Sequence, residues 1–193
     1  MEDMARPVLH DDSLKERLLD TTADLVHRMG PARVTLREVA AEAGTSTTAI
    51  YSLFGGKSQL LTAVVDNGFR SFGDAQRGAA GGGLRGLGLA YREWALEHPT
   101  LYRLMFGGTL AAYVDCSPTP VVASDAIAPL IEAVTSAQNA GAIRDLPAET
   151  VAVAIWGQVH GLVSLQLAEL GAPGTDWDAF YSEAIDAIAR GWA

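Results

Sequence analysis

The stretch TLREVAAEAGTSTTAIYSLFGGKSQLL, residues 35–61, decides the fold of the N-terminal part of this chain. It opens on Thr-Leu-Arg-Glu, the capping-box pattern that begins a helix. Shortly after a single glycine, Ser46 or Thr45 favours the start of a second helix. A glycine pair closes the second apolar segment. The stretch therefore predicts short helices over about 35–43 and 46–54, joined by a turn at Gly44, and a longer helix that begins at Lys57.

The two short helices fit a helix-turn-helix, in which the second helix enters the major groove of DNA. This unit needs a small residue where the helices approach most closely, which Ala40 supplies. It also needs apolar residues that hold the two helices together, and these are Val39, Ala43, Ile50 and Leu53. The second helix is then predicted to expose four short side chains to base edges and phosphates: Thr47, Thr48, Ala49 and Ser52.

Lys57 is one of only two lysines in the chain, and it directly follows the glycine pair. Two glycines permit a sharp turn and a close approach to another surface, so Lys57 and the first amides of its helix are predicted to face a DNA phosphate. Tyr51 is expected to bury its ring while its hydroxyl reaches the DNA backbone, and Thr35 to cap its helix and contact a phosphate. Arg37 and Ser46 complete the predicted DNA-binding set. Each residue taken singly also fits a plain structural role.

The net charge of -9 alone argues against a nucleic-acid-binding protein. The distribution of the charges along the chain matters more than their sum. Residues 1–70 hold eight Lys and Arg against ten Asp and Glu, whereas residues 71–193 hold six against thirteen. Residues 28–57 alone reverse the sign, with three arginines and one lysine against two glutamates. The locally basic segment therefore coincides with the predicted helix-turn-helix.

The rest of the chain also shows helical periodicity and no convincing strand pattern, which predicts an all-α protein. A further capping-box pattern, Ser13 with Glu16, predicts the start of the first helix. The glycine-rich run GAAGGG at 78–83 is the best candidate boundary between two parts. The other helices are expected over about 57–72, 84–97, 99–106, 121–140, 147–170 and 176–192, and residues 107–120 are expected to form a loop or a broken helix.

The stretch at residues 35–61 resembles the DNA-binding segment of the TetR family of transcriptional repressors. The matching residues are Thr35, Val39, Ala40, Gly44, Ser46, Tyr51, Phe54, Lys57, Leu60 and Leu61. The segments HPTLYRLMF (98–106) and WGQVHGLVSLQL (156–167) are similar to the C-terminal domain of a subgroup that carries a W-x-x-x-H-G motif. The resemblance implies a three-helix DNA-binding domain over 13–70, with a linking helix over 57–77, and an all-helical ligand-binding and dimerisation domain over 78–193.

The sequence departs from the family pattern in its recognition helix. Family members often carry a basic residue at the position of Thr47, glycine at that of Thr48, and Arg or His at that of Ser52. They often have a hydrophobic residue at the position of Thr45. Because this helix carries no positive charge, we expect modest affinity for each half-site and a shallow dependence of binding on salt.

Two helices of the second part are predicted to form the dimer interface, over about 148–170 and 176–192. The first has a row of small residues that lets another helix approach closely: Ala154, Gly157, Gly161, Ser164 and Ala168. The last helix offers an apolar set: Trp177, Phe180, Tyr181, Ala184, Ile185 and Ile188. Paired with their twins, these helices would form a four-helix bundle in a symmetric homodimer. The alternative is that they only close the core of one subunit.

A cavity for a small apolar or amphipathic effector is predicted in the second part. Its expected lining is Tyr91, Trp94, Leu101, Tyr102, Met105, Phe106, Trp156 and His160, with Gln158 as a second polar anchor. Ordinary core packing is the alternative for each aromatic residue, and a satisfied buried histidine is the alternative for His160.

The predicted function is a DNA-binding transcriptional regulator, which the resemblance makes a repressor released from a palindromic double-stranded operator by a small effector. The alternative is a constitutive dimeric DNA-binding protein without an effector. No paired carboxylates and no Ser/His/Asp spacing support an all-helical enzyme, so no catalytic residue or cofactor is predicted. The four histidines show no metal-ligand spacing.

The expected location is the cytoplasm. The lone Cys116 fits a reducing interior, and no signal-peptide pattern is present. An oxidation-sensing role for Cys116 has little support, since no basic neighbour in sequence would lower the pKa of its thiol. The charge-free run 150–168 is nearly long enough to cross a bilayer, but its amide, hydroxyl and imidazole side chains argue against a membrane span.

Overall fold

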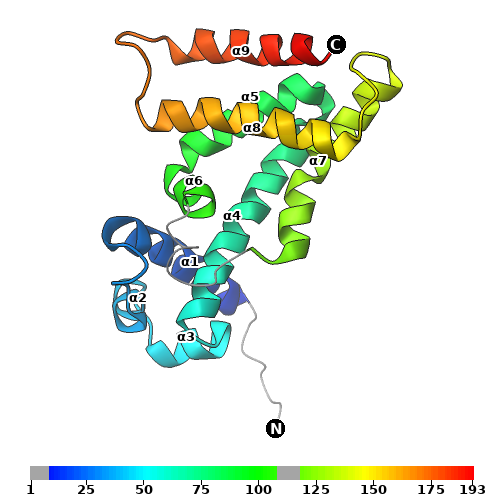
Figure 1. Ribbon diagram of the computed structural model, residues 1–193. Helices are drawn as coiled ribbons and strands as arrows, with labels where there is room; N and C mark the ends of the chain where they lie inside the picture. Colours follow the sequence, from blue (N-terminus) through cyan, green and yellow to red (C-terminus); the bar gives the residue numbers. More distant parts are fainter. Residues whose placement is uncertain (1–8, 108–117) are drawn as a thin grey trace. The chain divides into compact units, whose positions relative to one another are not determined.

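The computed structural model describes residues 9–107 and 118–193, and among these residues it contains helices and no strand (Figure 1). The chain forms two compact units. The first unit comprises Met1–Gly68 and Thr100–Thr119, and the second comprises Phe69–Pro99 and Pro120–Ala193. The predicted all-α class is confirmed for the described residues.

The first unit contains α1 (Leu9–Met29), α2 (Leu36–Glu42), α3 (Thr47–Phe54), the first part of α4 (Lys57–Ala79) and most of α6 (Pro99–Phe106). The residues predicted to lock the helix-turn-helix are buried, apart from Leu53, which is half-buried. The turn is fixed by a main-chain hydrogen bond of 2.8 Å from Thr45 to the Ala40 carbonyl. Arg17 of α1 donates its Nε proton to the Ala43 carbonyl at 3.1 Å, which ties α1 to the end of α2.

The first helix begins one turn earlier than predicted, at Leu9 instead of Ser13. Residues 9–12 contain neither glycine nor proline, so nothing in the sequence stops the helix from extending past the serine. Serine and glutamate three residues apart also occur inside helices. The capping-box pattern at Ser13 was therefore wrong as a helix start.

The glycine-rich run at 78–83 forms a tight turn inside the second unit. Helix α4 continues to Ala79, beyond both predicted ends, near residue 72 from periodicity and residue 77 from the family resemblance. A short 3-10 turn, η1 (Ala80–Gly82), then leads directly into α5 (Gly83–Glu97), and Gly83 has a φ of 60°, a conformation that favours glycine. The boundaries between the two compact units lie instead after Gly68, Pro99 and Thr119.

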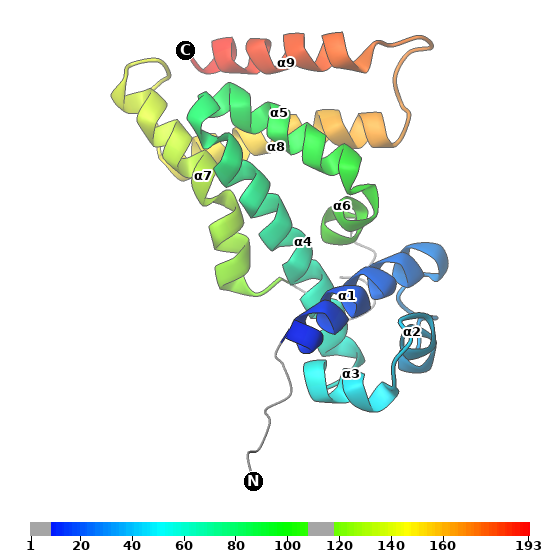
Figure 2. The same ribbon diagram turned by 180° about the vertical axis from the view of Figure 1, so that it is seen from behind.

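The second unit contains the end of α4, α5, α7 (Pro120–Asn139), α8 (Ala148–Leu167) and α9 (Trp177–Trp192). Helix α9 packs on α5 and α8, and α7 packs on α5 and α8 (Figures 1 and 2). Asp176 caps α9 by accepting hydrogen bonds from the main-chain N–H groups of residues 178 and 179. Helix α8 ends slightly before the predicted residue 170, since Glu169 takes a left-handed backbone conformation with φ of 55°.

The predicted loop over 107–120 cannot be followed as a whole, because residues 108–117, with Cys116, lie outside the described residues. Two described helices, α7 and α8, are long and apolar enough to cross a membrane by length and composition alone. That criterion is also met by core helices of globular proteins, and α8 contributes five buried side chains to the second unit: Val151, Ala152, Ile155, Val159 and Val163.

Candidate functional site

The start of α2 is held by a complete capping box. The Thr35 hydroxyl donates to Glu38 Oε2 at 2.8 Å, and the Thr35 main-chain N–H donates to the same oxygen at 2.9 Å. The Glu38 main-chain N–H donates to Thr35 Oγ1 at 3.3 Å. The hydroxyl of Thr35, followed by its backbone N–H, lowers the pKa of the Glu38 carboxyl, and the charges of Arg33 and Lys57 add to the effect. The capping role predicted for Thr35 is confirmed, while its phosphate contact stays a prediction.

Helix α3 exposes a different face from the predicted one. Ser46 caps the helix by accepting a hydrogen bond of 3.2 Å from the Ala49 N–H. Thr48 and Ser52 are exposed as expected, but Thr47 and Ala49 are half-buried. The exposed face is completed by Tyr51.

The prediction that Tyr51 buries its ring was wrong, because this side chain is 58% exposed. Successive helical residues are about 100° apart around the axis. Ile50 is fully buried against the rest of the first unit, so the next residue turns toward solvent, together with Thr48 and Ser52. An exposed aromatic ring with a hydroxyl at its tip is suited to contact a phosphate or a thymine methyl group.

Lys57 stands at the start of α4, after a turn that needs glycine. Gly55 has a φ of 89° and donates its N–H to the Tyr51 carbonyl at 2.9 Å, which ends α3. The Lys57 ammonium donates to the Ala32 carbonyl at 3.4 Å. This bond links the start of α4 to the segment between α1 and α2. An ammonium has three protons, so the contact leaves Lys57 able to bind an anion as well.

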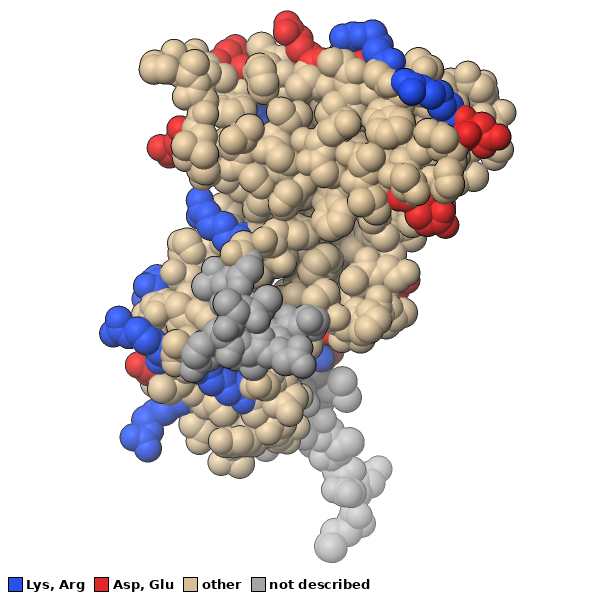
Figure 3. All heavy atoms as spheres, viewed as in Figure 1, with Lys and Arg blue, Asp and Glu red and all other residues tan. Residues whose placement is uncertain are grey.

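Two arginines of the first unit have exposed side chains that form no hydrogen bond or ion pair with another described residue: Arg33 and Arg37. Arg28, by contrast, forms an ion pair of 2.6 Å with Glu42. Figure 3 shows several Lys and Arg side chains on the visible face of the first unit. Arg33 was absent from the predicted DNA-binding set, although its place in the locally basic segment was visible in the sequence.

The residues predicted to line an effector cavity are divided between the two units. Tyr91, Trp94, Trp156 and His160 belong to the second unit, whereas Leu101, Tyr102, Met105 and Phe106 belong to the first. In the first unit, the rings of Tyr102 and Phe106 meet edge to face with centroids 5.1 Å apart. Met105 and Leu101 lie against Gly68 of α4, where a Cβ atom would stand 2.6 Å from the Met105 sulfur.

In the second unit, three of the predicted residues form a hydrogen-bonded cluster. The Tyr91 hydroxyl lies 2.9 Å from His160 Nδ1, and Trp156 Nε1 donates to the Tyr91 oxygen at 3.4 Å. Phe72 packs edge to face on both Tyr91 and Trp94. Burial lowers the pKa of His160, which favours a neutral imidazole at pH 7. The geometry fits both a structural cluster and a polar anchor for a ligand.

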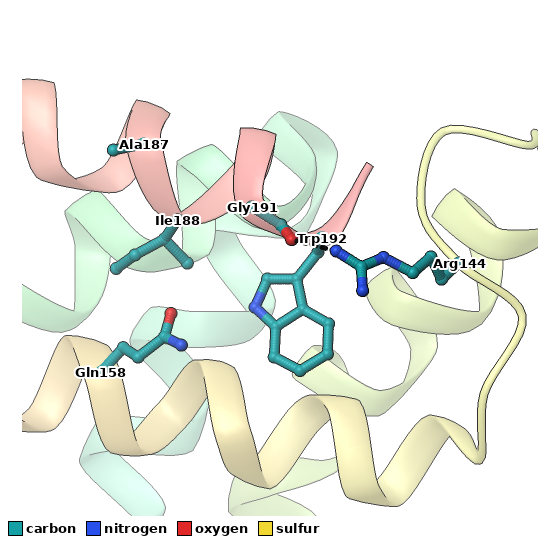
Figure 4. A pocket seen from close by; sticks show the side chains of 6 residues that line it. All are labelled: Arg144, Gln158, Ala187, Ile188, Gly191 and Trp192. Atoms are coloured by element: carbon teal, nitrogen blue, oxygen red, sulfur yellow. Dashed lines mark hydrogen bonds between the residues drawn. The ribbon is translucent and has the colours of Figure 1, made fainter.

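Gln158 was predicted to be a second polar anchor of the cavity that His160 lines, but the two side chains point in different directions. The two residues are about 200° apart around the axis of α8. Gln158 is exposed and lines a hollow of about 420 Å³ together with Arg144 and residues of α9: Ala187, Ile188, Gly191 and Trp192 (Figure 4). The Arg144 guanidinium donates to the Gly191 carbonyl at 2.7 Å, so it pairs a carbonyl group at the C-terminal end of α9. Gln158 is therefore removed from the predicted effector cavity.

No group of three or more His, Cys, Asp or Glu side chains is placed to hold a metal ion within residues 9–107 and 118–193. Charged side chains in the second unit pair at its surface instead. Arg92 bonds to Asp178 at 2.6 Å and to Gln166 at 2.8 Å, and Arg85 bonds to Asp186 at 2.9 Å.

Two family models match the chain. Residues 18–64 match the model described as "Bacterial regulatory proteins, tetR family", and residues 84–188 match the model described as "Tetracyclin repressor-like, C-terminal domain". The first match covers the helix-turn-helix, and the second covers more than half of the chain. No curated protein matches the sequence.

Solved structures share this fold over nearly the whole chain. A protein of unknown function from Rhodococcus sp. RHA1 is 25% identical, with a TM-score of 0.76 and 100% of both chains covered. A TetR family transcription regulator from Marinobacter aquaeolei VT8 is 23% identical, with a TM-score of 0.76, covering 96% of this chain and 98% of that one. The fatty acid degradation regulator FadR from Bacillus halodurans is 15% identical, with a TM-score of 0.73, covering 91% and 94%.

Proposed function

Because the chain belongs to the tetR family of bacterial regulatory proteins, we propose that it is a homodimeric repressor released from a palindromic operator by a small effector. Its family makes it a DNA-binding transcriptional regulator and not an enzyme. We propose the remaining parts: the palindromic operator, the small effector, the homodimer, repression in place of activation, and the cytoplasmic location.

The observation that carries the DNA-binding proposal is the exposed face of α3 beside the start of α4. Thr48, Tyr51 and Ser52 offer hydroxyl, methyl and aromatic groups without any charge, while cationic groups flank them at Arg33, Arg37 and Lys57. This division suits a protein in which the flanking cations hold phosphates and the helix contacts base edges. We assign Tyr51 and Ser52 to contacts at the edge of the major groove, where bases and the DNA backbone are both within reach.

The homodimer is supported by uncharged faces that α8 and α9 leave exposed. On α8, Val153 is 54% exposed, and Gly157 and Gly161 lie near it with no atom within 4 Å of where a Cβ would stand. On α9, Phe180, Ala187 and Gly191 are exposed along one side. Small residues permit close helix packing, and twofold symmetry supplies the two half-site readers that a palindrome needs.

Effector release is proposed as a shift between two dimer states. An effector that binds more tightly to the state whose half-site spacing does not fit the operator lowers DNA affinity by linkage. The Tyr91–Trp156–His160 cluster in the second unit is the proposed polar anchor, because it places hydrogen-bonding groups among buried aromatic and aliphatic side chains.

The test is selection of bound duplexes from a random pool, with the wild type and Lys57→Ala treated side by side. The expected result is an enriched palindrome that the variant binds more weakly at every half-site sequence, since Lys57 is assigned to a phosphate. Absence of any enrichment at low salt would contradict the assigned DNA surface. A second selection with the wild type and Arg103→Ala, an arginine of α6 in the first unit, controls for the general loss of a positive charge.

A further inference from the structure

Gln76 is a buried polar side chain whose amide nitrogen, Nε2, has no hydrogen-bond partner. The side chain is 5% exposed. The other buried polar side chains among the described residues belong to the first unit and are bonded: Thr22 donates to the Leu18 carbonyl, and Asp66 accepts two bonds from Thr119. Buried amides are nearly always paired in folded proteins, so Gln76 requires an explanation.

The backbone of α4 aims Gln76 into the middle of the second unit. Phe72 faces α5, where it packs on Tyr91 and Trp94. Gly73 faces α7, since a Cβ atom there would stand 3.3 Å from the Ala126 Cα. Gln76 follows Phe72 by four residues and Gly73 by three, so it projects between these two directions, about 40° from the first and 60° from the second.

The helix geometry directs the amide toward the Tyr91–Trp156–His160 cluster, which belongs to the same unit. A helical side chain leans toward the N-terminus of its helix, which carries Gln76 toward the level of Phe72 and so toward Tyr91. Helix α8, which holds the rest of the cluster, packs against both α5 and α7 (Figures 1 and 2). The same helices contribute buried apolar side chains to the second unit: Leu87, Val134, Ile155 and Val159.

The chemistry of this interior selects an uncharged ligand. The Tyr91 hydroxyl and the Trp156 indole are already hydrogen-bonded within the cluster, so the unpaired donor is the Gln76 amide N–H, which bonds to an oxygen acceptor. No charged side chain is buried among the described residues of the second unit, and Arg92 is engaged by Gln166 and Asp178. A carboxylate would be buried there without a cation, which is strongly unfavourable, whereas a carbonyl oxygen needs only a donor.

We infer that the Gln76 amide anchors an uncharged, mainly apolar effector through a carbonyl oxygen of the ketone or ester type. This inference rests on the proposed function, because it assigns the chemical class of the effector that releases the operator. Without the ligand, the amide stays unpaired. With the ligand, the Nε2 proton is satisfied, so occupancy stabilises α4 against α5 and α7 within the second unit.

The experiment compares the wild type with Gln76→Met, which keeps the side-chain length and removes the amide. Gln158→Met is the matched control, since it makes the same change at an exposed site on α8. The probes are a homologous series of alkyl methyl ketones, together with the carboxylates of the same chain length. Thermal unfolding and calorimetric titration are measured on the full chain without DNA.

We expect Gln76→Met to raise the Tm of the ligand-free protein, because an apolar group replaces an unpaired amide. We expect the ketones to raise the Tm of the wild type and to bind Gln76→Met about tenfold more weakly, the loss of one hydrogen bond. Carboxylates should bind neither protein, and Gln158→Met should match the wild type throughout.

Three results would overturn the inference. One is a Gln76→Met protein that melts lower than the wild type or fails to fold, since the amide would then have a structural partner. Another is ketone binding that is unchanged by Gln76→Met. The last is a wild type that binds no ketone, or binds carboxylates equally well. Operator binding, measured separately by fluorescence anisotropy, distinguishes these results from failure of the proposed function, because a regulator with another effector would still bind its operator.

Discussion

Replacing Gly157 with leucine is expected to weaken the proposed dimer while leaving the fold of a single subunit intact. Gly157 is an exposed residue inside α8, and a Cβ atom built there meets no atom within 4 Å. The added side chain therefore has room in the isolated subunit. Removing glycine from a helix interior also favours the helix by about 0.5–1 kcal/mol.

The magnitude follows from symmetry. If α8 meets its twin along the row of small residues, each leucine intrudes where two helices approach closely, and overpacking costs about 1–3 kcal/mol per site. A twofold interface contains the substitution twice, so the loss is about 2–6 kcal/mol. The dissociation constant of the dimer should then rise between about 30-fold and 20,000-fold.

The assay is sedimentation velocity over a range of protein concentrations, with circular dichroism on the same samples to follow helix content and Tm. Gly78→Leu is the matched control, since Gly78 is also an exposed helical glycine with nothing within 4 Å, but on α4. A Gly157→Leu protein that dimerises like the wild type would refute the assignment of this face. A monomeric variant with normal helix content would support it.

Three further outcomes are expected. Lys57→Ala should weaken binding to all duplexes alike and reduce the magnitude of the slope of log K against log salt by about 1.8 for a dimer, one phosphate per half-site; a changed base preference in a binding selection would show that the residue does not act on phosphate. Thr35→Ala should lower the free energy of unfolding in urea by about 1 kcal/mol, because the capping box is lost, and an unchanged midpoint would contradict that role. Burial lowers the pKa of His160 below 6.5, so the unfolded chain binds its proton more readily and the wild type should lose stability as the pH falls below 6.5; His160→Gln should flatten this decline in Tm, and an equal decline in both proteins would show that another group causes it.

Sequence reasoning was most successful where the determining interactions are local. Thr35 and Ser46 begin their helices as predicted, because a capping side chain bonds to the main chain only three residues away. Gly44 and Gly55 end the two short helices in a conformation that favours glycine. The same locality produced the error at Ser13, where a capping pattern occurs inside a longer helix.

The direction of single side chains depended on which helix faces which neighbour. Tyr51 was expected to bury its ring and is exposed. Gln158 was expected to anchor the same cavity as His160, and it lies on another side of α8. Apolar periodicity identifies the buried stripe of a helix. Whether a side chain at the edge of that stripe is buried or exposed depends on contacts with helices far away in sequence. Local sequence patterns do not predict those contacts.

The sequence by itself determined the helix-turn-helix with its caps and turns, because capping, glycine conformation and helical periodicity act within a few residues. Only the tertiary structure placed Phe72 and Gly73 against different helices, and with them directed Gln76 into the interior of the second unit. In the sequence, Gln76 is an ordinary polar residue on a helix. Whether a polar group is paired depends on every element around it, and that becomes known only once those elements have packed together.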